Sequence, residues 1–179
     1  LSYTPLGSTE TTGMTGERLT APPFPAGTVT GTDKDYAWLF EWSDTYAPKA
    51  LYMIQSAGLT ARVATAPFTA VLSDGKKKSF GYGTIMVQQG GNALPAGVVT
   101  AILRKVAEKC GITIQGVSTG LTPAGIDLGS GGFAVLGRPS VMLVIDEGTA
   151  VDDAGEIWHL LDTRYGMPVT LVSPSRIGS

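Results

Sequence analysis

Hydrophobic positions alternate between strand-like runs and helix-like spacing from residue 36 onward. Residues 36–42 are almost continuously apolar and aromatic, which predicts a strand buried on both faces. The next apolar residues, Ala47, Ala50, Leu51 and Ile54, follow the i, i+3, i+4, i+7 rule of an amphipathic helix. Gly58 stands where a left-handed residue would end that helix. A strand followed by a helix is therefore predicted at the start of the folded region.

The same alternation continues through the middle of the chain. Residues 60–66 and 84–88 have the composition of strands, and a turn-rich stretch around Ser73, Asp74 and Gly75 separates them. A second helix is predicted from Pro95 to Lys109, with Gly111 as its stop. Strand, helix and strand in this order predict a parallel βαβ unit.

The C-terminal third repeats the pattern once more. Residues 112–117, 141–146 and 169–173 are predicted strands, and a third helix is predicted from Asp153 to Tyr165. Asp153 and Glu156 have the spacing of a capping box. Alternating strands and helices of this length predict a mostly parallel sheet covered on both faces, a flavodoxin-like three-layer α/β/α sandwich.

The N-terminal residues differ from the rest of the chain. Residues 1–32 are rich in Gly, Pro, Ser and Thr and include the cluster Pro22-Pro23-Phe24-Pro25, which prevents a regular helix. We predict a linker or extended arm over residues 1–32 and one α/β domain over residues 33–179. Because the chain starts at Leu1 without an initiator methionine or targeting segment, we expect it to be a piece of a longer protein.

Charge and composition exclude several classes of partner. Lys and Arg number 13 against 15 Asp and Glu, a net charge of -2, which is not the basic footprint of a protein that binds nucleic acid. The longest apolar runs, such as residues 141–145, are far shorter than the ~20 residues of a membrane span. With Cys110 as its one cysteine, the chain has no internal disulfide.

One motif resembles the nucleophile elbow of a serine hydrolase. Residues 116–120 read Gly-Val-Ser-Thr-Gly at the end of a predicted strand, and Ser118, Asp146 and His159 follow the order nucleophile, acid, base. Two features weaken this interpretation. Pro123 and Gly125 disfavour the helix that normally follows an elbow. Ile157, Leu160 and Leu161 are predicted to form the buried face of the third helix, and His159 lies about 200° around that helix from Ile157. We therefore expect a surface histidine that does not serve Ser118.

The remaining motifs have simpler structural explanations. Cys110 continues the apolar stripe of the second helix, so a packed core thiol is expected. The Gly-x-Gly-x-x-Ala of residues 129–134 does not open a helix, which indicates a connection that approaches another part of the chain closely. Lys76, Lys77 and Lys78 follow an Asp-Gly turn and are expected to be a solvated loop tip.

No metal site is predicted in this chain. The acidic residues around the third helix lack the spacing of a calcium loop, and carboxylates favour a helix N-terminus without any metal: Asp146, Glu147, Asp152, Asp153 and Glu156. One histidine and one cysteine cannot make a usual zinc set.

Over residues 26–177 the chain resembles the class I glutamine amidotransferase-like domain at the C-terminus of bacterial zinc carboxypeptidases of the carboxypeptidase A type. The segments that carry this resemblance are Pro25 to Gly27, Tyr36 to Trp42, Tyr46 to Leu51, Phe80 to Ile85, Gly125 to Ser130 and Gly155 to Asp162. In active amidotransferases the elbow holds a cysteine, and Ser118 stands in the matching position. Their partnering His and Glu have no match in residues 168–179. The resemblance therefore implies a domain without glutamine hydrolysis.

The resemblance also implies a parent enzyme. Its zinc would be bound in an upstream catalytic domain of the same polypeptide, in a secreted or periplasmic protein, and this chain would be a non-catalytic accessory domain. The expected partner is that catalytic domain, with a homodimer left open. Two alternatives stay open: a serine hydrolase that uses Ser118, and a small-molecule binding module. The latter would use the crevice at the carboxyl ends of parallel strands, near Ser43, Gln88, Ser118 and Glu147.

Overall fold

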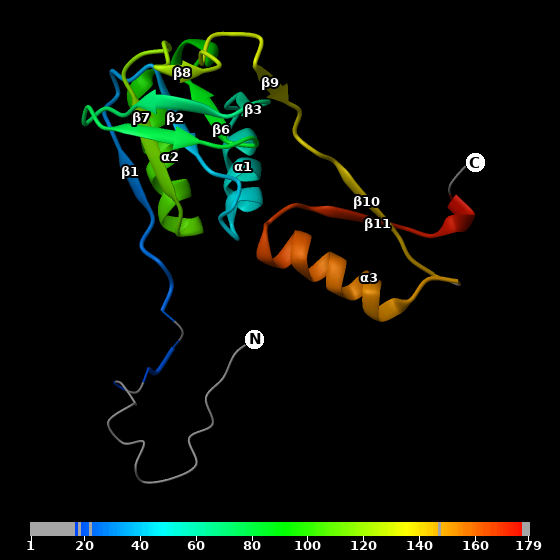
Figure 1. The fold of residues 1–179 in the computed structure, drawn as a ribbon. Helices are drawn as coiled ribbons and strands as arrows, with labels where there is room; N and C mark the ends of the chain where they lie inside the picture. Colours follow the sequence, from blue (N-terminus) through cyan, green and yellow to red (C-terminus); the bar gives the residue numbers. More distant parts are fainter. Residues whose placement is uncertain (1–16, 18, 22, 147, 177–179) are drawn as a thin grey trace.

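Six short strands form the central sheet of the computed structural model, which describes residues 17, 19–21, 23–146 and 148–176. Across the sheet the strands are β1 (Thr28–Thr30), β7 (Thr113–Val117), β2 (Ala37–Phe40), β6 (Ile85–Gln88), β3 (Ala61–Ala64) and β9 (Phe133–Leu136). Only β1 and β7 pair in parallel, and the other four pairings are antiparallel. The sheet is therefore mixed and mainly antiparallel (Figure 1).

Two helices cover one face of this sheet. Helix α1 (Ala47–Ser56) connects β2 to β3, and α2 (Ala96–Cys110) connects β6 to β7. The two crossovers interleave, because β6 lies between β2 and β3, while β2 lies between β6 and β7. This order of four strands and two helices is the split βαβ arrangement of ferredoxin-like folds.

A small second sheet covers the opposite face. Its strands are β5 (Lys77–Phe80), β4 (Phe68–Val71) and β8 (Ala124–Gly125), all antiparallel. Phe68 stacks on Phe80 and meets Phe133 of β9 edge-on, with ring centroids 5.3 Å apart in both pairs. The sheet face that is open in a simple two-layer fold is thus filled by a second apolar core.

Alternation along β2 explains how one strand serves both cores. Trp38 and Phe40 point to the helices, whereas Ala37 and Leu39 point to the small sheet, and all four are buried. This outcome confirms the prediction that residues 36–42 contain a strand buried on both faces. We call residues 28–136, which include both cores, the body.

The last segment stands apart from the body, as Figure 1 shows. It consists of β10 (Val141–Val144), α3 (Val151–Trp158), a π-helical turn η3 (His159–Arg164) and β11 (Val169–Val172). Strands β10 and β11 form a two-stranded parallel sheet of their own. We call residues 141–172 the C-terminal unit. The described residues also form two short 3-10 turns, η2 (Gln89–Gly91) after β6 and η4 (Pro174–Arg176) after β11.

The predicted flavodoxin-like sandwich with a mostly parallel sheet is wrong. The alternation of strands and helices was recognised, but it does not specify which strand lies between two others. The hairpin β4–β5 went unrecognised because its lysines were assigned to a solvated loop, and β9 because it lies in a Gly-rich segment. β1 lies within the segment predicted as a linker or extended arm.

The three predicted helices form, but the third begins at Val151 instead of Asp153 and continues as the π-helical turn η3 after Trp158. Helix α2 ends at Cys110, the following Gly111 is left-handed with φ 64° as predicted, and Gly58 after α1 has φ 83°. Helix α3 begins at Val151, and no side chain caps it, so the predicted capping box of Asp153 and Glu156 is wrong. Asp153 lies inside the first turn, where its negative charge interacts favourably with the positive end of the helix dipole.

Candidate functional site

Ser118 is the first residue after β7, and its side chain is exposed. The chain then bends through Thr119 and Gly120 and reaches the short strand β8 without forming a helix. An elbow serine relies on a following helix, whose N-terminal dipole and N–H groups stabilise an oxyanion. The structure therefore agrees with the expectation that Pro123 and Gly125 disfavour this helix.

His159 lies on a different part of the molecule from Ser118. It is the first residue of η3, its side chain is exposed, and α3 packs on β10 and η3 of the C-terminal unit. Asp146 also belongs to this segment, where its backbone N–H donates to Thr149 Oγ1 over 3.1 Å. Ser118 directly follows β7 and His159 directly follows α3, and Figure 1 shows these two elements well apart. A nucleophile must lie within about 3 Å of its base, so this pair is not arranged for catalysis.

The predicted ligand crevice does not assemble either. Gln88 and Val117 both pair with Ala37, so Gln88 and Ser118 lie at one end of the sheet. Ser43 follows the opposite end of β2, because antiparallel pairing reverses the strand between its neighbours. Glu147 lies outside the described residues. The Gln88 side chain makes a structural hydrogen bond instead, because its Nε2 donates to the Tyr36 hydroxyl over 2.6 Å.

Cys110 is a packed core thiol, as predicted. It is 2% exposed on α2, and its sulfur lies 3.8 Å from the Met53 sulfur of α1. Burial raises the pKa of this thiol, while Lys49 and Lys109 oppose the shift. A protonated, enclosed thiol is a poor nucleophile.

The glycine-rich segment is a close approach, again as predicted. At Gly132 an added Cβ would lie 2.9 Å from the Cβ of Ile126, and at Gly129 it would lie 3.1 Å from the Tyr36 hydroxyl. Gly132 leads directly into β9 and not into a helix, so the segment does not present the N-terminus that a phosphate needs.

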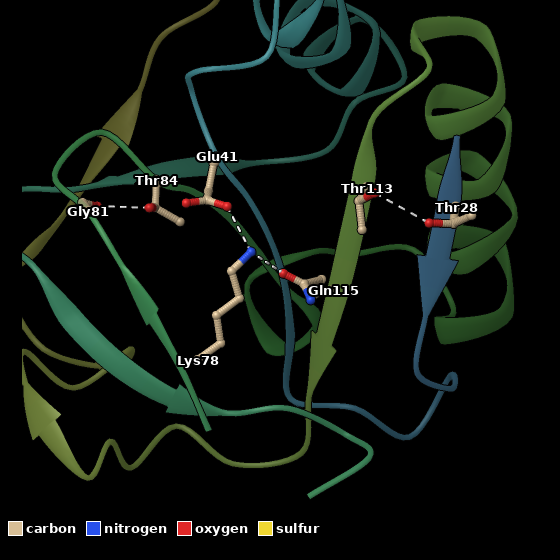
Figure 2. Close-up of polar contacts among 7 residues, drawn as sticks. All are labelled: Thr28, Glu41, Lys78, Gly81, Thr84, Thr113 and Gln115. Carbon is tan, nitrogen blue, oxygen red and sulfur yellow. Dashed lines mark hydrogen bonds and ion pairs between the residues drawn. The ribbon is translucent and has the colours of Figure 1, made fainter. Parts of the chain in front are cut away.

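Lys78 is not part of a solvated loop tip, contrary to the prediction. Figure 2 shows its ammonium reaching both the Glu41 carboxylate and the Gln115 side-chain oxygen, each at 2.7 Å. The same ammonium lies 4.8 Å from the centre of the Phe80 ring. These contacts tie the small sheet to the central sheet. One sequence signal could have predicted this position. In a strand, Lys78 lies on the same face as Phe80 two residues later, and Phe80 is buried.

Asp35 forms a second polar connection between the two sheets, which sequence reasoning missed. Its carboxylate is 6% exposed and accepts hydrogen bonds from the Ser73 hydroxyl and from the Thr32 N–H, both at 2.7 Å. An added Cβ at Gly116 would collide with this carboxylate, so glycine is required there. The spacing of Thr32 and Asp35 in the sequence indicates the turn that joins them. The hydrogen bond from Ser73 could not be predicted, because only the folded chain brings Ser73 close to Asp35.

No group of three or more potential metal ligands occurs among the residues that the structure describes. Within the same residues, no helix combines the length and the apolar character of a membrane span. The polar clusters just described connect structural elements, and we assign no chemistry to them.

The C-terminal unit carries the most conspicuous surface of the described chain. Between residues 141 and 175, leaving aside Glu147, Met167 is the one buried side chain. Large apolar side chains of this unit are exposed instead by 40% or more: Met142, Val151, Ile157, Trp158, Leu160 and Leu171. The prediction had Ile157 and Leu160 on a buried helix face, and both are exposed. This apolar surface is a candidate site of interaction.

A second apolar surface lies on the body beside the edge strand β9. It is a groove of about 230 Å³ between the middle of α1 and strands β3, β6 and β9. The groove is lined by Trp42, Leu51, Val63, Tyr82, Ile85 and Leu136. Trp42 is 44% exposed and Tyr82 is 75% exposed, so aromatic side chains border it on the solvent side.

Comparison of the chain with protein-family models, with curated proteins and with solved structures gives no match.

Proposed function

We propose that this chain is a non-catalytic accessory domain that acts through protein contacts, within the zinc carboxypeptidase to which the sequence motifs point. The zinc and the peptidase chemistry would belong to a catalytic domain upstream. The contribution of this domain would be to bind other parts of the assembly through apolar surface.

One observation carries the proposal: an entire supersecondary unit exposes its apolar side chains. Parallel strands are normally covered on both faces, and a two-stranded sheet is marginal by itself. The even-numbered residues Met142, Val144 and Val172 lie on the face of β10 and β11 away from α3, because Ile145 and Leu171 line the cleft toward the helix. Covering such a surface with another protein would remove its apolar area from water, which is favourable, so the exposed unit supports an interaction role.

The placement of the reactive side chains agrees with a non-catalytic role. Ser118 lies on the body and His159 on the C-terminal unit, and burial keeps the Cys110 thiol protonated and enclosed. The carboxypeptidase part of the proposal is supported by the six sequence segments between residues 25 and 162, with Ser118 in place of the amidotransferase cysteine.

The purified chain should be assayed with a fluorophosphonate probe, with glutamine, and with a C-terminal peptide substrate in the presence of zinc. We expect no labelling and no turnover, because the one histidine of the chain, His159, lies on the C-terminal unit and Ser118 on the body. Ser118→Ala and His159→Ala serve as matched controls for any trace signal. Labelling that disappears in both variants would refute the non-catalytic role in favour of a serine hydrolase.

A second experiment addresses the parent enzyme. If the coding sequence extends upstream of Leu1, we expect it to encode an H-x-x-E motif and a distant histidine, the zinc ligands of the carboxypeptidase type. An upstream region without those ligands would refute the carboxypeptidase assignment and leave the interaction role to be judged on the surface alone.

A further inference from the structure

We infer that two copies of this chain exchange their C-terminal units, so that the unit of each copy occupies the groove beside β9 of the other. This inference rests on the proposed role as an interaction domain and names its partner as a second copy of the chain.

The groove has the position and the apolar lining of a site that could accept another helix. It lies on the helix-covered face of the sheet, since Leu51, Val63 and Leu136 also pack against the core beneath α1 and α2. Helix α1 lies on one side of it, and β9, whose outer edge has no strand partner among the described residues, lies on the other. A helix placed beside α1 would cover Leu136 and the ring of Tyr82.

The C-terminal unit supplies a helix for the groove and strands for the edge of β9. Ile157 and Leu160 are 45% and 40% exposed on the α3–η3 helix. Within the part of the chain that the structure describes, β10 and β11 pair only with each other. Adding β10 or β11 to the outer edge of β9 would satisfy unpaired backbone groups in both sheets. The apolar helix face would then be covered together with the groove.

The unit of the same copy leaves the groove open. It is anchored elsewhere, where the Tyr165 hydroxyl donates to the Thr45 carbonyl over 3.4 Å and its ring meets Tyr46 at 6.5 Å. The connection from β9 to β10 is only residues 137–140, and Pro139 restricts its backbone. Short, restricted hinges favour exchange of a segment between copies over folding back.

Charge distinguishes exchange from a direct contact between two units. Residues 141–179 contain six carboxylates and two arginines, whereas residues 1–140 contain eleven Lys and Arg and nine carboxylates. A unit therefore attracts the body of another copy and repels another unit.

The test is the oligomeric state of the full chain by size-exclusion chromatography with light scattering. We expect a dimer of twice the 18.6 kDa chain mass at micromolar concentration. Tyr82→Asp in the groove and Ile157→Asp in the unit should each weaken the dimer by about tenfold or more. Leu121→Asp, a control at a 73% exposed position away from both surfaces, should leave the dimer unchanged.

Mixing identifies the exchange itself. A mixture of the Tyr82→Asp and Ile157→Asp chains contains one intact groove and one intact unit, so it should recover a dimer of intermediate strength. Inserting Gly-Ser-Gly-Ser between Arg138 and Pro139 should shift the wild-type dimer toward monomer, because a longer hinge allows the unit to fold back. Circular dichroism of every variant verifies that the body is folded.

Several results would overturn the exchange. A monomeric wild-type chain would contradict the exchange, whether its unit is extended or folded back. A dimer that is insensitive to Tyr82→Asp, or that does not recover when the two variants are mixed, would also contradict it. Association only with a different protein would also do so. A monomer without turnover would leave the non-catalytic role standing, whereas a dimer with Ser118-dependent turnover would refute that role and retain the exchange.

Discussion

The body and the C-terminal unit are built from similar sequence patterns and differ in what covers them. Leu103 of α2 is fully buried between the sheet and α1, whereas Leu160 of η3 is 40% exposed. Both residues belong to apolar stripes of a helix that follows a strand. The difference lies in the layers: the body covers both faces of its sheet, and the unit covers one face of two strands. Patterning makes a helix amphipathic, but a second surface is needed to bury it.

The largest expected effect tests this comparison directly. Leu103→Ala should lower the free energy of unfolding of the body by about 2–5 kcal/mol, because it leaves a cavity in a closed core. The matched Leu160→Ala should change that quantity by less than about 1 kcal/mol, since its side chain is 40% exposed and belongs to neither core of the body. Urea unfolding, followed by tryptophan fluorescence at a concentration where the chain is monomeric, measures both. Equal losses would show that the unit shares the core of the body.

A second prediction concerns the carboxylate between the two sheets. Asp35→Ala should destabilise the body by about 2 kcal/mol, because the Ser73 hydroxyl and the Thr32 N–H lose a charged acceptor in a buried site. Asp74→Ala is the control, since its ion pair with Lys76 at 2.9 Å lies at an exposed turn. If thermal unfolding finds the two variants equally stable, Asp35 does not connect the sheets as described.

Lys78 is expected to contribute less. Lys78→Met keeps the apolar stem over Phe80 and removes the ammonium from Glu41 and Gln115, with a loss of about 0.5–1 kcal/mol. Lys77→Met, at the neighbouring exposed position, should have no measurable effect. A loss that shrinks in high salt for Lys78→Met alone would support the ion pair. A Lys77→Met variant that is equally destabilised would contradict it.

The smallest expected effect on stability comes from Cys110, which also reports where the molecule opens. Its raised pKa means that unfolding favours ionisation, so its contribution to stability is present below the unfolded pKa of about 8.5 and declines as pH rises above it. At pH 8 a thiol reagent should react with Cys110 only when the body opens, and Leu103→Ala should accelerate labelling. Acceleration by Leu160→Ala as well would contradict independent opening of the two regions.

Much of the local structure followed from the sequence because it depends on neighbouring residues. The apolar run of residues 36–42, the stripe of α2 and the left-handed Gly111 each specify a local conformation, and each formed as predicted. The packed state of Cys110 followed from the same stripe. Hairpin β4–β5 was missed because a charged residue such as Lys78 is normally expected in solvent. Its ammonium is held in a partly buried position by Glu41 and Gln115, which come from distant parts of the chain.

The candidate site was less accessible to sequence reasoning. Ser118 and His159 could be listed from the sequence, but their separation depends on the C-terminal unit lying apart from the body. Ser43 and Gln88 were placed at one edge on the assumption of parallel strands, and antiparallel pairing sends them to opposite ends. The groove combines residues of four elements, so no local pattern could identify it.

The sequence by itself determined where the three helices form, which side chains are apolar, and that Ser118 has few partners for catalysis. It also located strands β2, β3, β6, β7, β10 and β11. Tertiary structure alone decided the order of the strands, the cover on the second face of the sheet, and the exposure of the C-terminal unit. The physical reason is range. Backbone conformation and amphipathicity arise within a few residues, whereas strand order and burial depend on contacts between segments far apart in the chain.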